Sequence, residues 1–445
     1  MVLAVAFALF LVFAFPGYSS PDSAQQLGQA RAHHYSDGHP PLMAVIWGLV
    51  EHIVKDTAGM LVLQGSLFLA GLFVLLRRHM AQLTAAIAAG VILLLPPVLA
   101  PMGVIWKDSQ MAGFLMLGIA LLPNQHRAWR IVGIVSIAFG IGMRHNALVA
   151  AFPMFVFVWP GPANARTVVR LALAGLLWVV VSAVAVETNE HLADDHEHAW
   201  HYSVGPADIA GVLANTKTVY SDAELEKLLA GTPLILHKDI QNNARRNYEP
   251  SMWWPVMNDG EAHIFNWPTN DTERAAITRA WKELVRAETW PWMHHRLRVF
   301  RLMLGLHKTN NAAISAPYFF ARDVQHDESP PSAPARLIQR IIEWVATKTP
   351  IDRPYCYLIA SLLLLPFARR NRDALALLFS GILYELTYLP VTPSVEYRYS
   401  HWMICCCLVG AAILIATRAA SASARRSGSS SPKARPVENA SGARS

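Results

Sequence analysis

The sequence predicts an all-α polytopic membrane protein with about ten transmembrane helices, juxtamembrane helices and a mostly helical extracytoplasmic loop region. Hydrophobic residues make up 53% of its 445 residues and charged residues only 16%, whereas about a quarter of the residues of a soluble domain are charged. Apolar segments close to the roughly 20 residues that cross a bilayer recur along the chain. Basic residues are concentrated in every second turn between these segments.

The apolar segments form two groups, separated by one long polar region. Residues 2–15 lack the basic start and the small-residue cleavage site of a signal peptide. They are therefore interpreted as a true span, or as one whose first residues lie before Met1. The candidate spans are residues 2–15, 57–76, 82–100, 109–122, 131–142, 147–158, 169–186, 355–367, 374–389 and 401–416.

The distribution of basic residues predicts the orientation, because cytoplasmic turns carry an excess of lysine and arginine. With the N-terminus in the cytoplasm, five basic turns alternate with five turns that hold only isolated basic residues. We therefore expect a multi-pass protein of the cytoplasmic (inner) membrane with both termini cytoplasmic and residues 187–354 outside. The basic turns contain Arg77 and Arg78; Arg127 and Arg130; Arg166 and Arg170; Arg369, Arg370 and Arg372; and the C-terminal tail.

Four regions are predicted along the chain. Residues 1–186 form an N-terminal transmembrane module with two outer catalytic loops, residues 187–354 an extracytoplasmic region with surface helices, and residues 355–417 the C-terminal transmembrane helices. Residues 418–445 form a basic cytoplasmic tail, whose six basic residues and one acidic residue account for most of the net charge of +7. Its Ser/Ala/Gly-rich composition predicts disorder. Since the excess charge lies in this tail, we expect contact with anionic lipid and no nucleic-acid partner.

The polar region has its own helix signals. "SDAELEKLLAG" (221–231) has a Ser/Asp start and a Gly stop, so it predicts a capped helix. Residues 270–306 alternate charged and bulky apolar residues at helical spacing, which predicts one helix along the membrane surface; for its first half, a soluble-domain helix fits equally. "DESPPSAPAR" (327–336) is typical of a linker. The four cysteines lie in or beside apolar segments, which predicts neither a disulfide framework nor structural zinc.

Ionisable residues at the outer ends of several spans are the candidate functional residues. Such groups are costly to hold there unless they pair or face water. Each has a plain alternative: an acid after a span can be a solvated turn residue, His39-Pro40-Pro41 can be a rigid turn, and Asp108 can be the N-cap of its helix. The set comprises Asp22, Asp37, His39, Lys107, Asp108, Arg144, His145, Tyr397 and Arg398.

The chemistry of this set suits sugar transfer from a lipid phosphate. Carboxylates can take the proton of an acceptor hydroxyl as general bases. Arginine, lysine, histidine or a metal can stabilise the charge that develops on a departing phosphate. Because such a donor is anchored in the bilayer, we expect the site at the membrane surface.

The chain also resembles the GT-C type of integral-membrane glycosyltransferases, which use polyprenyl-phosphate sugars. The resembling pieces are "SSPDSAQQLGQA", "DGHPPLMAVIW", "WKDSQ", "RHN" and "EYRYSHW", with "WPWMHHRLRVFRLMLG" similar to a surface helix of that family. With the acids and cations on one side of the membrane, we hypothesise an inverting glycosyltransferase that acts on an envelope lipid, glycan or protein.

By position, the resemblance makes Asp22 the general base and Asp108 a second carboxylate that aids the base or a metal. Lys107, Arg144 and Arg398 would bind the donor phosphate, with His39 and Asp37 on the first-loop side of the cleft. Ser23 stands where many relatives have an acid. This departure leaves open whether Asp22 or Asp37 is the base. It also leaves open whether a divalent cation is needed, with Asp22 and Asp108 as candidate ligands.

Two other interpretations stand beside this one. A transporter or flippase for a lipid-linked sugar is the alternative function, although the sequence has no clear repeat symmetry and Glu385 is its one acid within a predicted span. A non-catalytic scaffold would explain the Trp-rich loop but not the acids and cations at four span ends. The His- and Asp-rich "NEHLADDHEHAWH" is interpreted as a solvated polar collar or a metal site, and its spacing matches no established ligand pattern.

Overall fold

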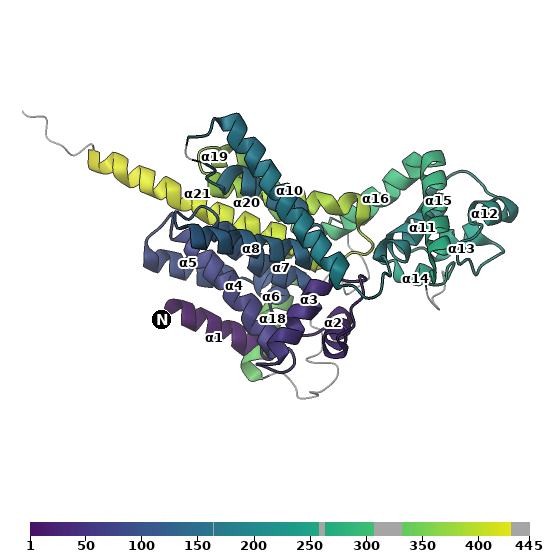
Figure 1. Cartoon of the computed structure of the whole chain (residues 1–445), viewed down its shortest axis with the longest axis horizontal. Coiled ribbons are helices and arrows are strands. Elements are labelled where there is room, and N and C mark those ends of the chain that lie inside the picture. Colours follow the sequence, from purple (N-terminus) through teal and green to yellow (C-terminus); the bar gives the residue numbers. More distant parts are fainter. Residues whose placement is uncertain (163, 258–262, 307–331, 429–445) are drawn as a thin grey trace, which may run out of the picture.

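The computed structural model describes residues 1–162, 164–257, 263–306 and 332–428, with side chains up to residue 422. The described part consists of helices joined by loops and contains three isolated β-bridges but no strand. Figure 1 shows a bundle of long helices and, beside one end of it, a smaller group of helices formed by the middle of the chain. We call this smaller group the outer domain.

The bundle surrounds one large hydrophobic core. Nine of the ten predicted apolar segments each lie on one of its helices, with a π-helical turn over Met154–Val158 completing the sixth, and the segment at residues 82–100 is divided between two helices that meet at Leu95. The helices are α1 (Val2–Ala14), α4 (Ala58–Leu76), α5 (Gln82–Leu94), α6 (Pro96–Met102), α7 (Lys107–Leu121), α8 (Arg127–Met143), α9 (Ala147–Pro153), α10 (Thr167–Leu192), α19 (Pro354–Ala368), α20 (Arg372–Val391) and α21 (His401–Gly428).

Among the described residues, four stretches are long and apolar enough to cross a membrane: Ala58–Leu76, Thr167–Leu192, Arg372–Val391 and Tyr397–Ala422. Helices α5 and α6 meet at 69° and make a fifth if they count as one broken span. The break falls at Pro96 and Pro97, because a proline keeps the residue before it out of the helix. The chain is thus a multi-pass membrane protein, and the number of ten crossings stays a prediction.

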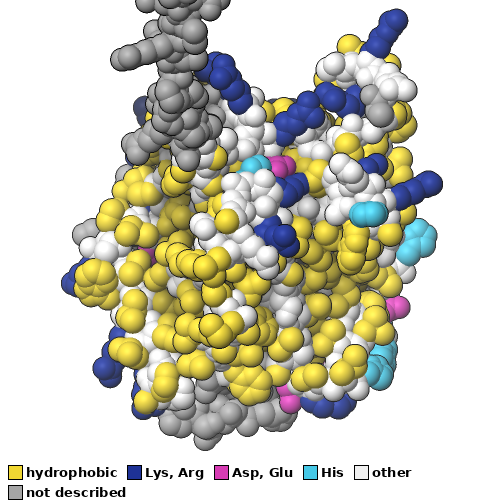
Figure 2. All heavy atoms as spheres, turned by 90° about the vertical axis from the view of Figure 1, so that its left-hand side faces the viewer, with side chains coloured by type: hydrophobic (Ala, Val, Ile, Leu, Met, Phe, Trp, Pro, Cys, Tyr) yellow, Lys and Arg dark blue, Asp and Glu magenta, His cyan; other side chains and the backbone are white. Residues whose placement is uncertain are grey.

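Ion pairs join two turns at one end of the bundle, and a hydrogen bond links them to the last turns of α7. Asp373, at the start of α20, lies 3.2 Å from Arg78 Nη2 and 2.8 Å from His79 Nε2, both just after α4. Arg78 also donates to the carbonyl of Ile119, near the end of α7, at 3.5 Å. Figure 2 looks at this end and shows a largely hydrophobic surface with arginine and lysine side chains around it. The basic turns after α4 and before α20 therefore lie at the same end of the bundle. Asp22, Lys107 and Arg398 lie at the opposite end.

The outer domain has a separate hydrophobic core, which includes Ile209, Leu213, Leu225 and Phe265. The predicted capped helix at residues 221–231 is confirmed, since Ser221 and Glu224 form a capping box at the start of α12 and Gly231 follows with a φ of +81°. The helices are α11 (Val204–Asn215), α12 (Asp222–Leu228), α13 (Ile240–Asn247), α14 (Trp254–Met257) and α15 (Asp271–Ala287), preceded by a 3₁₀ turn at Ala199–His201.

The single helix predicted for residues 270–306 is wrong, because the chain forms two. Helix α15 ends at Ala287, Glu288 leaves the helical region, and α16 (Thr289–Met303) begins. Pro291 is the cause, since its ring would clash with the carbonyl of Ala287 in a continuous helix but is tolerated in a first turn. Helix α15 packs in the outer domain, whereas α16 contributes Phe300 and Met303 to the bundle core and joins the two parts.

Two further segments extend the bundle. Helix α18 (Ala333–Lys348) buries Ile342 in the bundle core and packs on α1 and α6, although residues 187–354 were assigned to one outer region. Helix α21 continues to Gly428, so the first part of the tail predicted as disordered is helical instead, because its Ala-rich sequence favours helix. The first half of the predicted 327–336 linker (residues 327–331) and residues 429–445 lie outside the described residues.

Candidate active site

The structure brings six of the predicted residues into one connected network at the end of the bundle opposite the Arg78–Asp373 pair. They come from three parts of the chain that are distant in sequence: the first loop and α2 (Pro21–Ala32), the start of α7 with the end of α8, and the 3₁₀ turn Tyr397–Ser400. The six residues are Asp22, His39, Lys107, Asp108, Arg144 and Arg398.

A backbone bridge and side-chain hydrogen bonds fix the first loop against the second. Tyr18 and Val104 form an isolated parallel bridge, and the Ser23 hydroxyl donates to the carbonyl of Ile105 at 2.7 Å. Trp106 Nε1 donates to Ser20 Oγ at 2.9 Å, and Ser20 caps α2. Asp22, in the first turn of α2, is therefore held beside the start of α7.

Asp22 is paired with Arg398. Arg398 Nη1 lies 2.8 Å from Asp22 Oδ2, while its Nε lies 2.5 Å from Glu396 Oε2 and its guanidinium stacks 4.9 Å from the Trp106 ring centre. Burial by itself raises the pKa of Asp22, but the charges of Arg398, His39 and Lys107 outweigh it and hold the pKa well below its usual range. Asp22 is therefore an anion throughout the neutral pH range.

His39 lies between Asp22 and Lys107. Its Nδ1 is 2.5 Å from Lys107 Nζ and its Nε2 is 3.8 Å from Asp22 Oδ1. Burial, and then the charge of Lys107, lower the pKa of His39 to about 3. The imidazole is thus neutral near pH 7, its Nδ1 accepts from the Lys107 ammonium, and its Nε2–H faces the carboxylate.

Asp108 is the counter-ion of Arg144. Arg144 Nη1 donates to both carboxylate oxygens at 2.6 Å, and the Tyr384 hydroxyl donates to Oδ1 at 3.4 Å. The guanidinium lies 4.6 Å from the ring centre of Tyr399 and 5.4 Å from that of Tyr388. Asp108 is fully buried. It is not the N-cap of α7, the alternative considered from the sequence, because that position belongs to Trp106.

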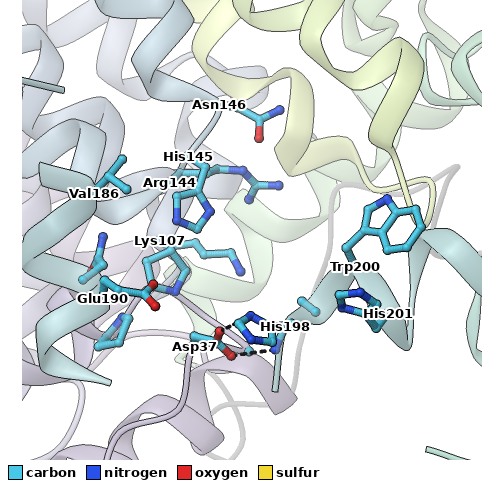
Figure 3. A pocket seen from close by; sticks show the side chains of 15 residues that line it. Asp37, Lys107, Arg144, His145, Asn146, Val186, Glu190, His198, Trp200 and His201 are labelled. Carbon is cyan, nitrogen blue, oxygen red and sulfur yellow. Dashed lines mark hydrogen bonds and ion pairs between the residues drawn. The ribbon is translucent and has the colours of Figure 1, made fainter. Parts of the chain in front are cut away.

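A cavity of about 490 Å³ opens between the bundle and the outer domain. Figure 3 shows Lys107, Arg144 and His145 on one side of it and Trp200 and His201 on the other. Asp37 lies on its wall, where its carboxylate accepts from the backbone N–H of His198 at 2.8 Å and pairs with His198 Nδ1 at 3.0 Å. The described residues that line this cavity include Asp37 but not Asp22.

Sequence reasoning missed several partners of the network. Glu396 and Tyr399 were within a quoted motif but were given no role. Tyr384 and Tyr388, whose hydroxyls are 2.9 Å apart, lie four residues apart on an apolar helix, a spacing that places both on one face. Tyr397, also among the candidates, forms a hydrogen bond with Asp352 outside the network.

The candidate metal ligands do not form a metal-binding site among the described residues. Asp22 is engaged by Arg398 and Asp108 by Arg144, so each candidate carboxylate already has a cation. In the "NEHLADDHEHAWH" segment, the ring nitrogens of His196 and His198 each pair with the Asp37 carboxylate. Within the described ranges, no group of three or more His, Cys, Asp or Glu side chains is arranged to hold a metal ion. We therefore assign no step to a metal.

Comparisons with known proteins give one similarity. No protein-family model and no curated protein matches the chain. Among solved structures, the chain is similar to the crystal structure of ArnT from Cupriavidus metallidurans bound to undecaprenyl phosphate, with 12% sequence identity and a TM-score of 0.35 over 95% of this chain and 78% of that chain.

Proposed function

We propose that the chain is an inverting glycosyltransferase that moves a sugar from a polyprenyl-phosphate donor to an envelope lipid, glycan or protein. The observation that carries the proposal is the network that joins an ionised acid, Asp22, to the cations Lys107 and Arg398, beside a cavity that Lys107 and Arg144 line. It lies at one end of an apolar bundle, where a donor anchored in lipid can reach it. In the proposed orientation this end is extracytoplasmic and both termini are cytoplasmic.

The proposed reaction is a single displacement. An oxygen of the acceptor hydroxyl forms a bond to the anomeric carbon as the bond from that carbon to the phosphate oxygen breaks, and the configuration inverts. Asp22 takes the hydroxyl proton. The polyprenyl phosphate leaves with the electron pair, and Lys107, Arg144 and Arg398, with His39 beside them, stabilise its charge.

The low pKa of Asp22 bears on its role as a base. In the free protein Arg398 and Lys107 stabilise the Asp22 anion, which weakens it as a proton acceptor. A donor phosphate bound to these cations would offset their charge. The basicity of Asp22 would then rise when the donor is in place, which ties proton transfer to a loaded site.

Asp37 is the second candidate for the base, because it lies on the cavity wall and the sequence left the choice open. Its carboxylate is held by His198 rather than by the Arg398 side of the network. Asp22→Asn and Asp37→Asn separate the two. The variant of the true base loses turnover, and the other variant changes mainly the KM of the acceptor.

The test is sugar transfer by purified protein in proteoliposomes. Asp22→Asn should lower kcat by about 10²–10⁴-fold, the usual contribution of a general base, and leave membrane insertion unchanged. Asp271→Asn, at an exposed carboxylate in the outer domain, is the control. Full activity of Asp22→Asn and Asp37→Asn would reject both as the base.

Transport of a lipid-linked sugar is the second candidate, and Glu385 is the observation that favours it. This acid is fully buried within α20, accepts from the Ser400 hydroxyl at 2.7 Å, and its other oxygen has no hydrogen-bond partner among the described residues. Buried acids within spans often serve transport. A transporter would move labelled donor across the liposome membrane without consuming it, whereas the proposed enzyme releases polyprenyl phosphate.

A further inference from the structure

Four aromatic side chains of the outer domain pack together, and we call them the aromatic cluster: Tyr202, Trp253, Trp254 and Trp267. The ring centres of Tyr202 and Trp267 are 4.4 Å apart, those of Tyr202 and Trp253 5.6 Å, and those of Trp254 and Trp267 6.2 Å. Tyr202 and Trp253 lie against the hydrophobic core of the domain. Trp254 and Trp267 remain 51% and 38% exposed. The core thus supports two large rings that solvent can reach.

The aromatic cluster adjoins the proposed active site on two sides. Tyr202 follows directly after Trp200 and His201, which line the cavity. On the other side, the backbone N–H of Val395 donates to the carbonyl of Ser251 at 2.8 Å. This bond ties the segment that leads into Trp253 to the loop that presents Arg398. A molecule seated on the cluster therefore reaches the site without crossing the bundle.

Polar groups lie between the aromatic cluster and the cavity. A methyl group at Gly38, a cavity-lining residue, would lie 2.7 Å from Glu197 Oε2 and 3.1 Å from the Tyr202 hydroxyl oxygen. The carboxylate and the phenol thus meet at the same point of the cavity rim, and Gly38 leaves room for both. Both groups can exchange hydrogen bonds with hydroxyl groups.

This combination of groups selects a class of ligand. Exposed aromatic rings offer apolar faces to the C–H surfaces of a sugar, and a few placed polar groups at a pocket rim bind its hydroxyls. The acid Glu197 at the rim disfavours an anionic ligand. Insertion of Trp254 and Trp267 into the lipid interface is the rival role, since tryptophan is enriched there, but it gives no reason for a carboxylate and a phenol that meet at the cavity.

We propose that the aromatic cluster, with Glu197 at the cavity rim, is a binding subsite for a neutral saccharide, namely the sugar portion of the acceptor. The proposal rests on the proposed glycosyltransferase function and narrows its acceptor to one that carries a saccharide. The cluster holds the acceptor chain on the outer domain, while its reacting hydroxyl enters the cavity beside Lys107 and Arg144.

Equilibrium binding tests the subsite apart from catalysis. The probes are neutral hexasaccharides of the gluco, manno, galacto and arabino series, titrated by calorimetry into full-length protein in lipid nanodiscs. We expect one series to bind, and Trp254→Ala and Trp267→Ala each to weaken binding by about ten-fold, as expected for loss of one aromatic contact. Trp290→Ala, at a tryptophan that is 78% exposed on α16, is the matched control and should bind like the wild type.

Gly38→Ala offers a second variant that removes no aromatic side chain. Its methyl group would displace Glu197 and Tyr202 at the rim, so it should also weaken binding. No binding of any series to the wild type, or equal binding by Trp254→Ala, Trp267→Ala and wild type, overturns the proposal. Equal binding by the tryptophan variants leaves insertion into the lipid interface as the role of the two rings.

Failure of the subsite and failure of the proposed function give different results. If the protein binds a hexasaccharide through the cluster but transfers no sugar, the subsite stands and the enzymatic role falls. If it transfers sugar and the tryptophan variants leave the KM of a saccharide acceptor unchanged, the role stands and the subsite falls. If both hold, these variants raise the KM of the acceptor and leave the KM of the donor as it was.

Discussion

The pairing of Asp108 with Arg144 leads to a prediction that separates a structural acid from a catalytic one. Asp108 is fully buried, and Arg144 Nη1 donates to both of its oxygens at 2.6 Å. Replacing Asp108 by Asn removes the charge and keeps the volume. Arg144 Nε has no hydrogen-bond partner among the described residues, so the arginine would keep mainly its contacts with the rings of Tyr388 and Tyr399.

The magnitude follows from the burial of the pair. Removing one partner of a buried ion pair costs about 3–5 kcal/mol, because the other charge is left unpaired. Only 11% of the Arg144 side chain reaches solvent, on the cavity side, and water there offsets part of the loss. Each aromatic contact contributes about 0.5–2 kcal/mol and is already present in the wild type. We therefore expect Asp108→Asn to lower the free energy of unfolding by about 3 kcal/mol.

The assay is unfolding in mixed micelles of dodecyl maltoside and dodecyl sulfate, followed by tryptophan fluorescence. The double variant Asp108→Asn with Arg144→Gln removes both charges and should recover about 2 kcal/mol of the loss, since the two residues are in direct contact. Asp271→Asn, at an exposed pair, should change stability by less than about 1 kcal/mol. If Asp108→Asn is as stable as the wild type, Asp108 is not the counter-ion of Arg144. Asp108 would then fit better the role that the resemblance implies, that of a second catalytic carboxylate.

Three further predictions concern other buried ionisable groups. His39 has a pKa of about 3 in the folded protein and about 6.5 when unfolded; below pH 6.5 the unfolded chain alone takes the proton, so stability is lost as pH falls. A change from pH 7 to pH 5 should lower the free energy of unfolding by about 2 kcal/mol in the wild type and by less in His39→Gln. Unfolding measured at both pH values tests this. Asp352 should make stability depend on pH in the opposite direction. Burial raises its pKa to about 7, so stability is lost as pH rises through the range from about 4 to 7. Asp352→Asn should be more stable than the wild type at pH 8, by roughly 2–4 kcal/mol, and equal stability there would show that the carboxyl is solvated. Asp208 lies 2.7 Å from Arg296 Nε and 2.9 Å from His295 Nε2, and accepts hydrogen bonds from two tryptophans. Asp208→Asn should cost about 3–5 kcal/mol and make the outer domain sensitive to limited proteolysis, whereas unchanged digestion would contradict a role for this cluster in holding the domain.

The sequence predicted the residues of the site better than their partners. An ionisable group near the end of an apolar segment is a candidate by sequence, and five such residues lie in one network: Asp22, Lys107, Asp108, Arg144 and Arg398. Their catalytic and phosphate-binding roles stay predictions. Which cation pairs with which acid was beyond the sequence, because it depends on how the loops pack.

The outer domain was the part least accessible to sequence reasoning. Its capped α12 was predicted from local signals, but the long helix at residues 270–306 was not seen to break before Pro291. The packing of α18 on α1 and α6 was not foreseen either. Amphipathic helices bury one face against whatever lies beside them, and the sequence of the helix does not identify that neighbour.

By itself, the sequence determined the helical membrane character of this protein and the segments that form its apolar helices, because hydropathy and charge act on each stretch of chain locally. Only the tertiary structure decided that Asp22 faces Arg398 and that Asp108 is the partner of Arg144. Those pairs join residues far apart in the sequence. The contacts that select them, such as Ser23 with Ile105 and Tyr18 with Val104, form only once the loops are packed together.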